Sequence, residues 1–121
     1  MKKILMITLL LPILTCNSCK KNNQLFVCKN KIKYVVSGSA AEVLITYSDE
    51  NSSNKVVVVD STKTPWEYNF KVRPDNFVYL QAKNRTNLGD VIVEIKQNNK
   101  TLFENKNDQP FGIATCSGYV K

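Results

Sequence analysis

The chain lacks histidine altogether, and cysteine, glycine, proline and tryptophan are scarce among its 121 residues. Without histidine there is no Ser-His-Asp triad, no histidine metal ligand and no imidazole general base. Long hydrophobic runs are lacking too, because the longest one, residues 4–14, has about half the length that a membrane-spanning helix needs. These absences exclude histidine-dependent catalysis and argue against a membrane-spanning helix.

What is present at the start of the chain has the parts of a secretory signal. Lys2 and Lys3 form a cationic head, residues 4–14 form an apolar core, and Ser18 places a small residue before Cys19. This arrangement resembles the signal of bacterial lipoproteins, as found in the Bacteroidetes, in which the cysteine after the cut receives a diacylglycerol. We therefore predict a lipid on Cys19.

A lipid on this cysteine divides the chain into three segments. They are a signal peptide over residues 1–18, a polar tether over residues 19–30 and a folded domain over residues 31–121. Bacteroidetes lipoproteins sent to the cell surface tend to carry acidic residues after the lipidated cysteine, whereas Lys20 and Lys21 follow it here. We expect an outer-membrane lipoprotein of the cell envelope that faces the periplasm. Plain secretion, a lipid on Cys16 and a retained anchor are the alternatives.

The cysteine count agrees with an exported protein. Cys16 leaves with the signal and Cys19 is lipidated, so that Cys28 and Cys116 remain as an even pair outside the reducing cytosol. We predict a disulfide between them, which would stabilise the domain by about 4 kcal/mol in the chain-entropy model. The alternative is two separate thiols packed as small apolar groups.

Apolar residues alternate with polar ones along most of the remaining chain, which is the pattern of half-buried strands. The strand-like segments are residues 32–36, 43–47, 56–59, 66–72, 78–82, 91–95 and 111–120. Turn residues separate them: a polar run at residues 49–54, Pro74 in the second position of a turn, and the pair Asn98 and Asn99. The sequence predicts an immunoglobulin-like antiparallel β-sandwich of about seven strands.

An ordered set of motifs resembles the MmpS-like family of small membrane-associated proteins. The motifs are residues 32–38 (IKYVVSG), 45–47 (ITY), 64–66 (TPW), 79–84 (YLQAKN), 91–95 (VIVEI) and 100–102 (KTL). The resemblance implies an immunoglobulin-like sandwich held at a membrane and, as in the actinobacterial members, work beside a transporter of the RND type. Those members differ in keeping an N-terminal transmembrane helix. Their hairpin cysteine falls near Val93, so any disulfide here must use Cys28.

Two functions fit these observations. The first is a non-catalytic interaction domain, anchored in the envelope and docked to another envelope protein. The second is a small ligand- or glycan-binding module that uses exposed aromatic rings, with Trp66 and Tyr68 as the main candidates. Aromatic residues at a spacing of two are more often core, so we expect Trp66 to belong to the core.

Catalysis is the third class, and the sequence gives it little support. Asp49 and Glu50 are the only adjacent acidic pair and fall in a predicted hairpin loop. Ser117 lacks the flanking pattern of a nucleophile elbow, and Cys116 has no histidine base. We expect no enzyme activity, no cofactor and no metal site. The formal net charge of +7 does not indicate nucleic-acid binding, because no RNA-binding or zinc-finger spacing is present.

Overall fold

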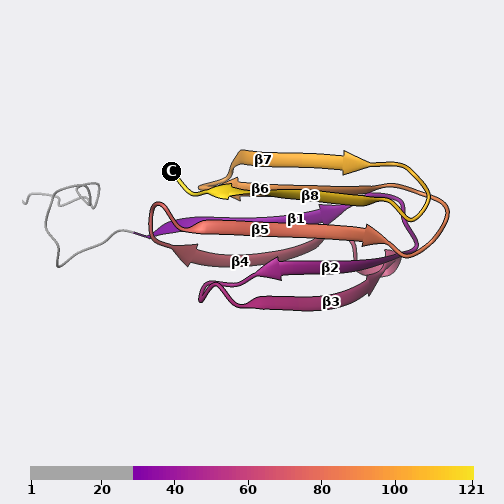
Figure 1. The fold of residues 1–121 in the computed structure, drawn as a ribbon, viewed down its shortest axis with the longest axis horizontal. Coiled ribbons are helices and arrows are strands. Elements are labelled where there is room, and N and C mark those ends of the chain that lie inside the picture. The colour runs from indigo at the N-terminus through magenta and orange to yellow at the C-terminus, as the bar shows by residue number, and fades with distance from the viewer. Residues whose placement is uncertain (1–28) are drawn as a thin grey trace, which may run out of the picture.

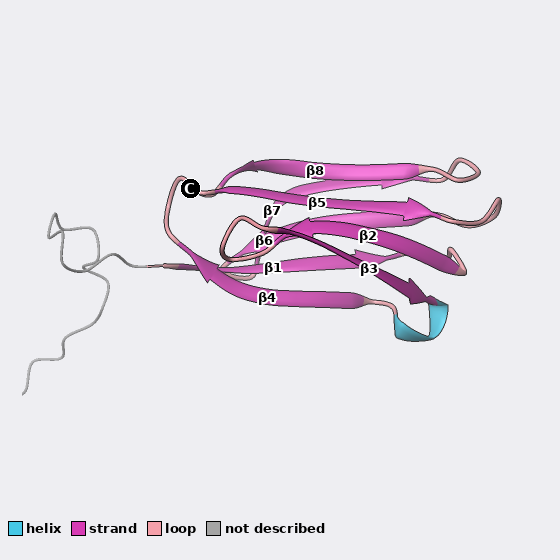
Figure 2. Ribbon diagram, turned by 60° about the horizontal axis from the view of Figure 1, so that its bottom comes forward, coloured by secondary structure: helices cyan, strands magenta, loops and turns pink. Residues whose placement is uncertain are grey.

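The computed structural model describes residues 29–121, which form eight strands and one short 3-10 helix (Figure 1). The strands are β1 (Asn30–Ser37), β2 (Glu42–Ser48), β3 (Asn54–Asp60), β4 (Trp66–Val72), β5 (Phe77–Asn84), β6 (Val91–Gln97), β7 (Lys100–Asn107) and β8 (Ile113–Tyr119). The helix, η2 (Ser61–Lys63), joins β3 to β4 (Figure 2). The predicted all-β domain is confirmed, with eight strands instead of about seven.

The strands form two antiparallel four-stranded sheets that pack face to face. The first sheet has the order β4-β1-β6-β7 and the second has the order β3-β2-β5-β8. β1 pairs with β4 and β6, while β2 pairs with β3 and β5, so that strands adjacent in the sequence often lie in opposite sheets. This architecture confirms the predicted antiparallel sandwich. Its four-plus-four arrangement differs from the four-plus-three of a constant immunoglobulin domain.

The core lies between the sheets and consists of the alternate apolar residues that the sequence pattern indicates. Fully buried residues come from both sheets: Ile32, Tyr34, Val36, Val43, Ile45, Val78, Leu80, Ala82, Val91, Val93 and Ile95. Burial of each large aliphatic side chain contributes about 1.5–3 kcal/mol. Tyr34 also links the sheets, because its buried hydroxyl donates to the backbone carbonyl of Ser48 at 2.8 Å. Burial raises the pKa of Tyr34 to about 12.

Two of the connections follow directly from their turn residues. Asn98 and Asn99 have φ angles of 53° and 69°, as a two-residue hairpin between β6 and β7 requires. In the turn that starts at Arg73, Asp75 has a φ of 70° and the Asn76 amide donates to the Arg73 carbonyl at 3.3 Å. Both predicted turns are therefore present.

Several predictions lie outside the described residues. They are the signal peptide over residues 1–18, the lipid on Cys19 and most of the tether over residues 19–30. Asn30, the last tether residue of the prediction, already pairs with Val72 as the first residue of β1. Within residues 29–121, no helix has the length and hydropathy to cross a membrane.

Candidate functional site

The two aromatic residues predicted to contact a ligand belong to an aromatic cluster on the inner side of β4. Trp66 and Tyr68 lie on the same side of the strand as Phe70, and all three are half-buried against the core. The ring centre of Tyr47 in β2 lies 5.1 Å from that of Trp66 and 4.8 Å from that of Tyr68. These rings fill the space between the sheets, which agrees with the expectation that Trp66 belongs to the core.

The Tyr68 hydroxyl is also used within the fold. It donates to the Glu50 carboxylate at 2.6 Å, joining β4 to the loop between β2 and β3. This hydrogen bond is the main reason why the pKa of Tyr68 is raised and that of Glu50 is lowered. The pair is therefore a link between the sheets, and a ligand contact of Trp66 and Tyr68 stays a prediction.

Cys116 is a buried thiol on the inner side of β8, with 7% of its surface exposed. Burial raises its pKa to about 12, so that the sulfur is protonated and a poor nucleophile at neutral pH. Its predicted disulfide partner, Cys28, lies outside the described residues, and the pairing stays a prediction. Alkylation of the unfolded, unreduced chain followed by intact-mass measurement tests it.

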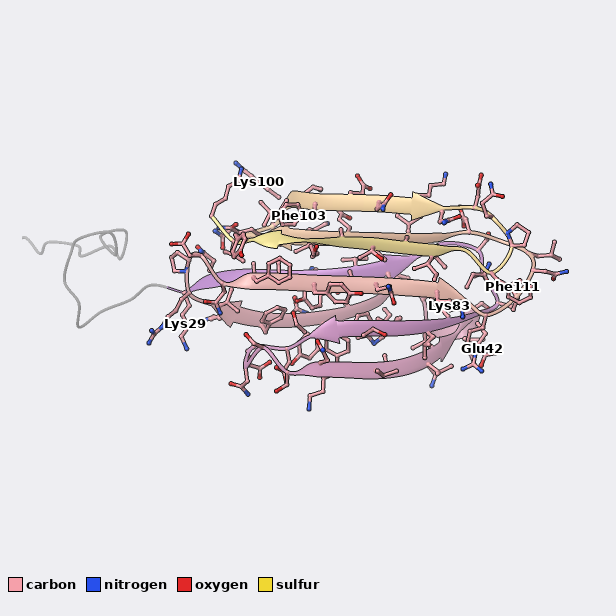
Figure 3. All side chains as sticks on the ribbon, viewed as in Figure 1. Lys29, Glu42, Lys83, Lys100, Phe103 and Phe111 are labelled. Carbon is pink, nitrogen blue, oxygen red and sulfur yellow. The ribbon has the colours of Figure 1, made fainter. Side chains whose placement is uncertain are left out.

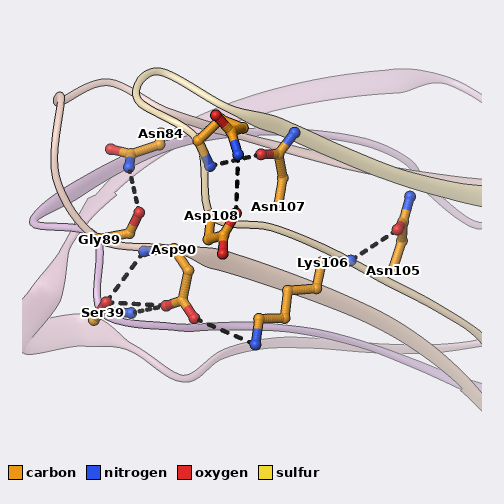
Figure 4. Close-up of polar contacts among 9 residues, drawn as sticks. Ser39, Asn84, Gly89, Asp90, Asn105, Lys106, Asn107 and Asp108 are labelled. Carbon is orange, nitrogen blue, oxygen red and sulfur yellow. Dashed lines mark hydrogen bonds and ion pairs between the residues drawn. The ribbon is translucent and has the colours of Figure 1, made fainter.

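The acidic residues of the loops are engaged in local structure. Asp90 accepts hydrogen bonds from the backbone amide and the hydroxyl of Ser39 at 2.7 and 3.0 Å, and it lies 4.0 Å from the Lys106 ammonium (Figure 4). The bond from the Ser39 amide is the main cause of the lowered pKa of Asp90. Among residues 29–121, no three cysteine, aspartate or glutamate side chains form a metal-binding group.

The outer face of the first sheet carries most of the strand charges. Its outward residues on β1, β4, β6 and β7 include Lys31, Lys33, Glu67, Lys71, Glu94, Lys96, Glu104 and Lys106. Lys33 lies 3.9 Å from Glu67 on the neighbouring strand, and the hydroxyl of Thr101 donates to Glu94. We call this surface the charged face.

The outer face of the second sheet is almost free of charge, and we call it the uncharged face. Its outward residues between the two ends of the strands are Leu44, Thr46, Val56, Val58, Tyr79, Gln81, Thr115 and Ser117, with Phe77 and Tyr119 at one end and Ile113 at the other. Val56 and Tyr119 are 64% and 66% exposed. Charges enter only at the end that carries Glu42, Asp60 and Lys83, of which Glu42 and Lys83 are labelled in Figure 3.

A shallow hollow of about 400 Å³ lies on the uncharged face. Its lining combines two aromatic rings with small uncharged polar side chains: Thr46, Ser48, Ser52, Asn54, Phe77 and Tyr79. The Ser48 hydroxyl accepts a hydrogen bond from the Tyr79 backbone amide at 3.1 Å, which fixes one wall. Hydroxyl and amide groups can both donate and accept hydrogen bonds. The hollow therefore suits a neutral ligand with apolar and hydroxyl-bearing surfaces.

Comparison with known proteins adds no family to this description. No protein-family model matches the sequence, and no curated protein matches it either. The uncharged face is a surface that the sequence did not predict. Its signal was weak, because the run from Val56 to Val59 is apolar at every position and does not show which valines point outward.

Proposed function

We propose that the protein is a lipid-anchored component of the bacterial cell envelope whose sandwich is a non-catalytic interaction domain. The lipid is carried by Cys19, and the domain faces the periplasm from the outer membrane. A transporter of the RND type is the first candidate for the partner, because of the resemblance to MmpS-like proteins. The uncharged face of the second sheet is the proposed contact surface.

The exposed valines of the uncharged face are the observation that supports this proposal most. Val56 and Val58 are 64% and 45% exposed and stand beside Thr46 and Leu44 on the neighbouring strand. Apolar surface of this kind adds nothing to the folded core, and contiguous exposed patches mark interaction sites. The charged face offers no comparable area, since charged residues are depleted from the centres of protein interfaces.

Site-specific photo-cross-linking in the native host tests the contact surface. A photoreactive amino acid at Val58 should capture one dominant envelope protein, identified by mass spectrometry. The same amino acid at Lys33, on the charged face, is the matched control and should capture none. Equal capture of unrelated neighbours from both positions would contradict the proposal.

Labelling with radioactive palmitate tests the anchor separately. The wild-type chain should incorporate the label, and a Cys19→Ala variant should not. Label that persists in this variant would move the lipid to Cys16. Secretion of the wild-type chain without label would contradict the proposed lipid anchor. The proposed interaction domain would then depend on the cross-linking result alone.

The hollow supports a second candidate function, the binding of a small neutral ligand such as a glycan. Phe77, which is 47% exposed, and Tyr79 are the two rings that line the hollow beside its uncharged polar side chains. Titration of the protein with neutral oligosaccharides, followed by amide NMR, should shift Ser52 and Asn54. Phe77→Ala should abolish the shifts and Phe111→Ala, at a similarly exposed ring outside the hollow, should not. Shifts centred on Trp66 would contradict this location.

A further inference from the structure

The two ends of the sandwich differ in charge. The end at which β1 begins gathers basic residues from four strands, from the β4–β5 connection and from the segments before β1 and after β8: Lys29, Lys31, Lys71, Arg73, Lys96, Lys100 and Lys121. We call this end the basic tip, and Lys29 and Lys100 mark it in Figure 3. At the opposite end, acidic residues are at least as numerous as basic ones: Glu42, Asp60, Glu67, Asp90 and Asp108 against Lys63, Lys83, Arg85 and Lys106.

Acidic residues at the basic tip are few and largely engaged. Asp75 lies in the turn before β5. Asp49 accepts hydrogen bonds from two backbone amides and lies 3.9 Å from the Lys55 ammonium, while Glu50 accepts from Tyr68. The three ion pairs between described residues use the ammonium groups of Lys33, Lys55 and Lys106, and none uses one of the seven basic residues that define the tip. The ammonium groups of the tip are therefore available to an anionic partner.

A hollow of about 310 Å³ on the basic tip has the lining of an anion site. It is formed by Gln97, Asn98, Lys100, Thr101, Leu102 and Lys121. The backbone of Lys121 is held in place, because its carbonyl accepts from the side chains of Asn30 and Gln97 at 3.1 and 3.0 Å. The Gln97 amide is engaged with the Lys121 backbone, and the Thr101 hydroxyl donates to Glu94. The two lysine ammonium groups and the Asn98 amide remain to donate hydrogen bonds to a phosphate group in this space.

Exposed aromatic rings adjoin the same tip. Phe77 and Tyr119 pair across β5 and β8 at the end nearest the basic residues, and they are 47% and 66% exposed. Rings with one apolar and one wet side favour the boundary between lipid and water. Basic residues beside apolar rings are the combination that an anionic bilayer surface attracts.

The chain toward Cys19 leaves from this tip as well. Lys29 is the first described residue and directly precedes β1. A segment of ten residues spans at most about 33–36 Å when fully extended. A lipid on Cys19 therefore keeps the basic tip within reach of the headgroups, whereas the opposite end points away.

We propose that the basic tip docks on the anionic phospholipid surface to which the chain is anchored, with a lipid phosphate in the hollow between Lys100 and Lys121. This docking deepens the proposed lipid anchoring and depends on it for its orientation. In this orientation the long axis of the sandwich is perpendicular to the membrane plane. The uncharged face then stands perpendicular to the bilayer, accessible to a neighbouring envelope protein.

Paramagnetic relaxation in nanodiscs tests the docking with the mature lipidated protein. Discs of phosphatidylcholine with roughly a third phosphatidylglycerol, doped with a gadolinium-labelled lipid, should broaden the amide signals of Phe77, Lys100 and Lys121. The signals of Glu42 and Lys83 at the opposite end should stay sharp. The broadening should weaken in high salt and in discs of phosphatidylcholine alone, because charges near an anionic surface are screened.

Matched charge reversals complete the test. The triple variant Lys71→Glu, Arg73→Glu, Lys100→Glu should remove the selective broadening, while Lys63→Glu, Lys83→Glu, Arg85→Glu changes the net charge equally and should not. Equal broadening at both ends, or the same response to both triple variants, would overturn the docking. If a triple variant does not fold, the salt series on the wild-type protein decides. Palmitate labelling is scored separately, so a labelled chain with an undocked tip rejects this inference alone.

Discussion

The charged face and the uncharged face belong to sheets of equal size that bury their inner residues in the same way. On β1 and on β5, alternate residues are almost completely buried, for example Tyr34 and Leu80. The outward residues between them differ, since β1 exposes Lys31 and Lys33 and β5 exposes Phe77 and Tyr79. Because the inner faces are equivalent, the folding of the domain does not explain the difference between the outer ones.

The difference indicates that the two faces meet different surroundings. Charged outward residues keep the first sheet in water, as in most soluble domains. The second sheet exposes Val56 and Val58 on its edge strand, β3. Exposed apolar residues on an edge strand promote association with other chains unless a partner covers them. The two faces share one core, and the charge of their outward residues distinguishes them.

Substitutions of core residues beneath the two faces should cause the largest losses of stability, and the losses should be similar for both faces. Leu80→Ala removes a fully buried side chain under the uncharged face, and Ile95→Ala removes one under the charged face. Each should lower the free energy of unfolding by about 2–5 kcal/mol. Urea denaturation followed by Trp66 fluorescence measures both. A much smaller loss for one of them would show that the core is not shared evenly by the sheets.

Removal of the hydroxyl that links the sheets should have an intermediate effect. Tyr34→Phe leaves the Ser48 carbonyl without its buried donor and should lower the free energy of unfolding by about 1–2 kcal/mol. Tyr79→Phe is the matched control, because its hydroxyl forms no hydrogen bond among residues 29–121. Equal losses in the two variants would mean that the Tyr34 hydroxyl does not stabilise the fold.

Sequence patterning predicted the inner faces much better than the outer ones. The alternation in residues 32–36 and 91–95 indicates which residues are buried, whatever strand they pair with. The Asn98–Asn99 turn was also predictable from its local chemistry. The uncharged face and the basic tip depend on strand order instead. Lys31 and Lys100 reach the same end only because β1 pairs with β6 and β6 with β7, which no local pattern encodes.

The aromatic residues of β4 also show how far the sequence pattern predicts burial. Trp66 and Tyr68 alternate with polar residues, and this spacing correctly indicates that they share a side of β4. It does not indicate that β4 is an edge strand, where inward rings stay half-buried. Phe77 and Tyr79, which line the hollow, also alternate with other residues along their strand, β5. Unlike Trp66 and Tyr68 they point away from the core, and only the assembled sheet shows this.

A charge on the uncharged face should change association with little change in stability. Val58→Lys replaces a side chain that is 45% exposed and should alter the free energy of unfolding by less than about 0.5 kcal/mol. Cross-linking from Val56 in this variant should fall at least tenfold. The reciprocal change Lys33→Val, on the charged face, should not create a new cross-link. An unaffected cross-link from Val56 would mean that the partner contacts another surface.

The smallest expected effect is a pH dependence at the link between Tyr68 and Glu50, which connects the first sheet to the loop of the second. The hydrogen bond lowers the pKa of Glu50 below its ordinary value of 4.5, so the ionised carboxylate favours the folded state. This contribution is present above pH 4.5 and is lost as the pH falls through the lowered pKa. In Tyr68→Phe, the pKa of Glu50 measured by carbon-13 NMR should move upward, and the loss of stability between pH 5 and pH 3 should shrink. Asp90, whose pKa is lowered by Ser39 at the opposite end, is the internal control and should titrate as in the wild type. A pKa of Glu50 that stays low without the Tyr68 hydroxyl would show that the two sheets are not coupled through this pair.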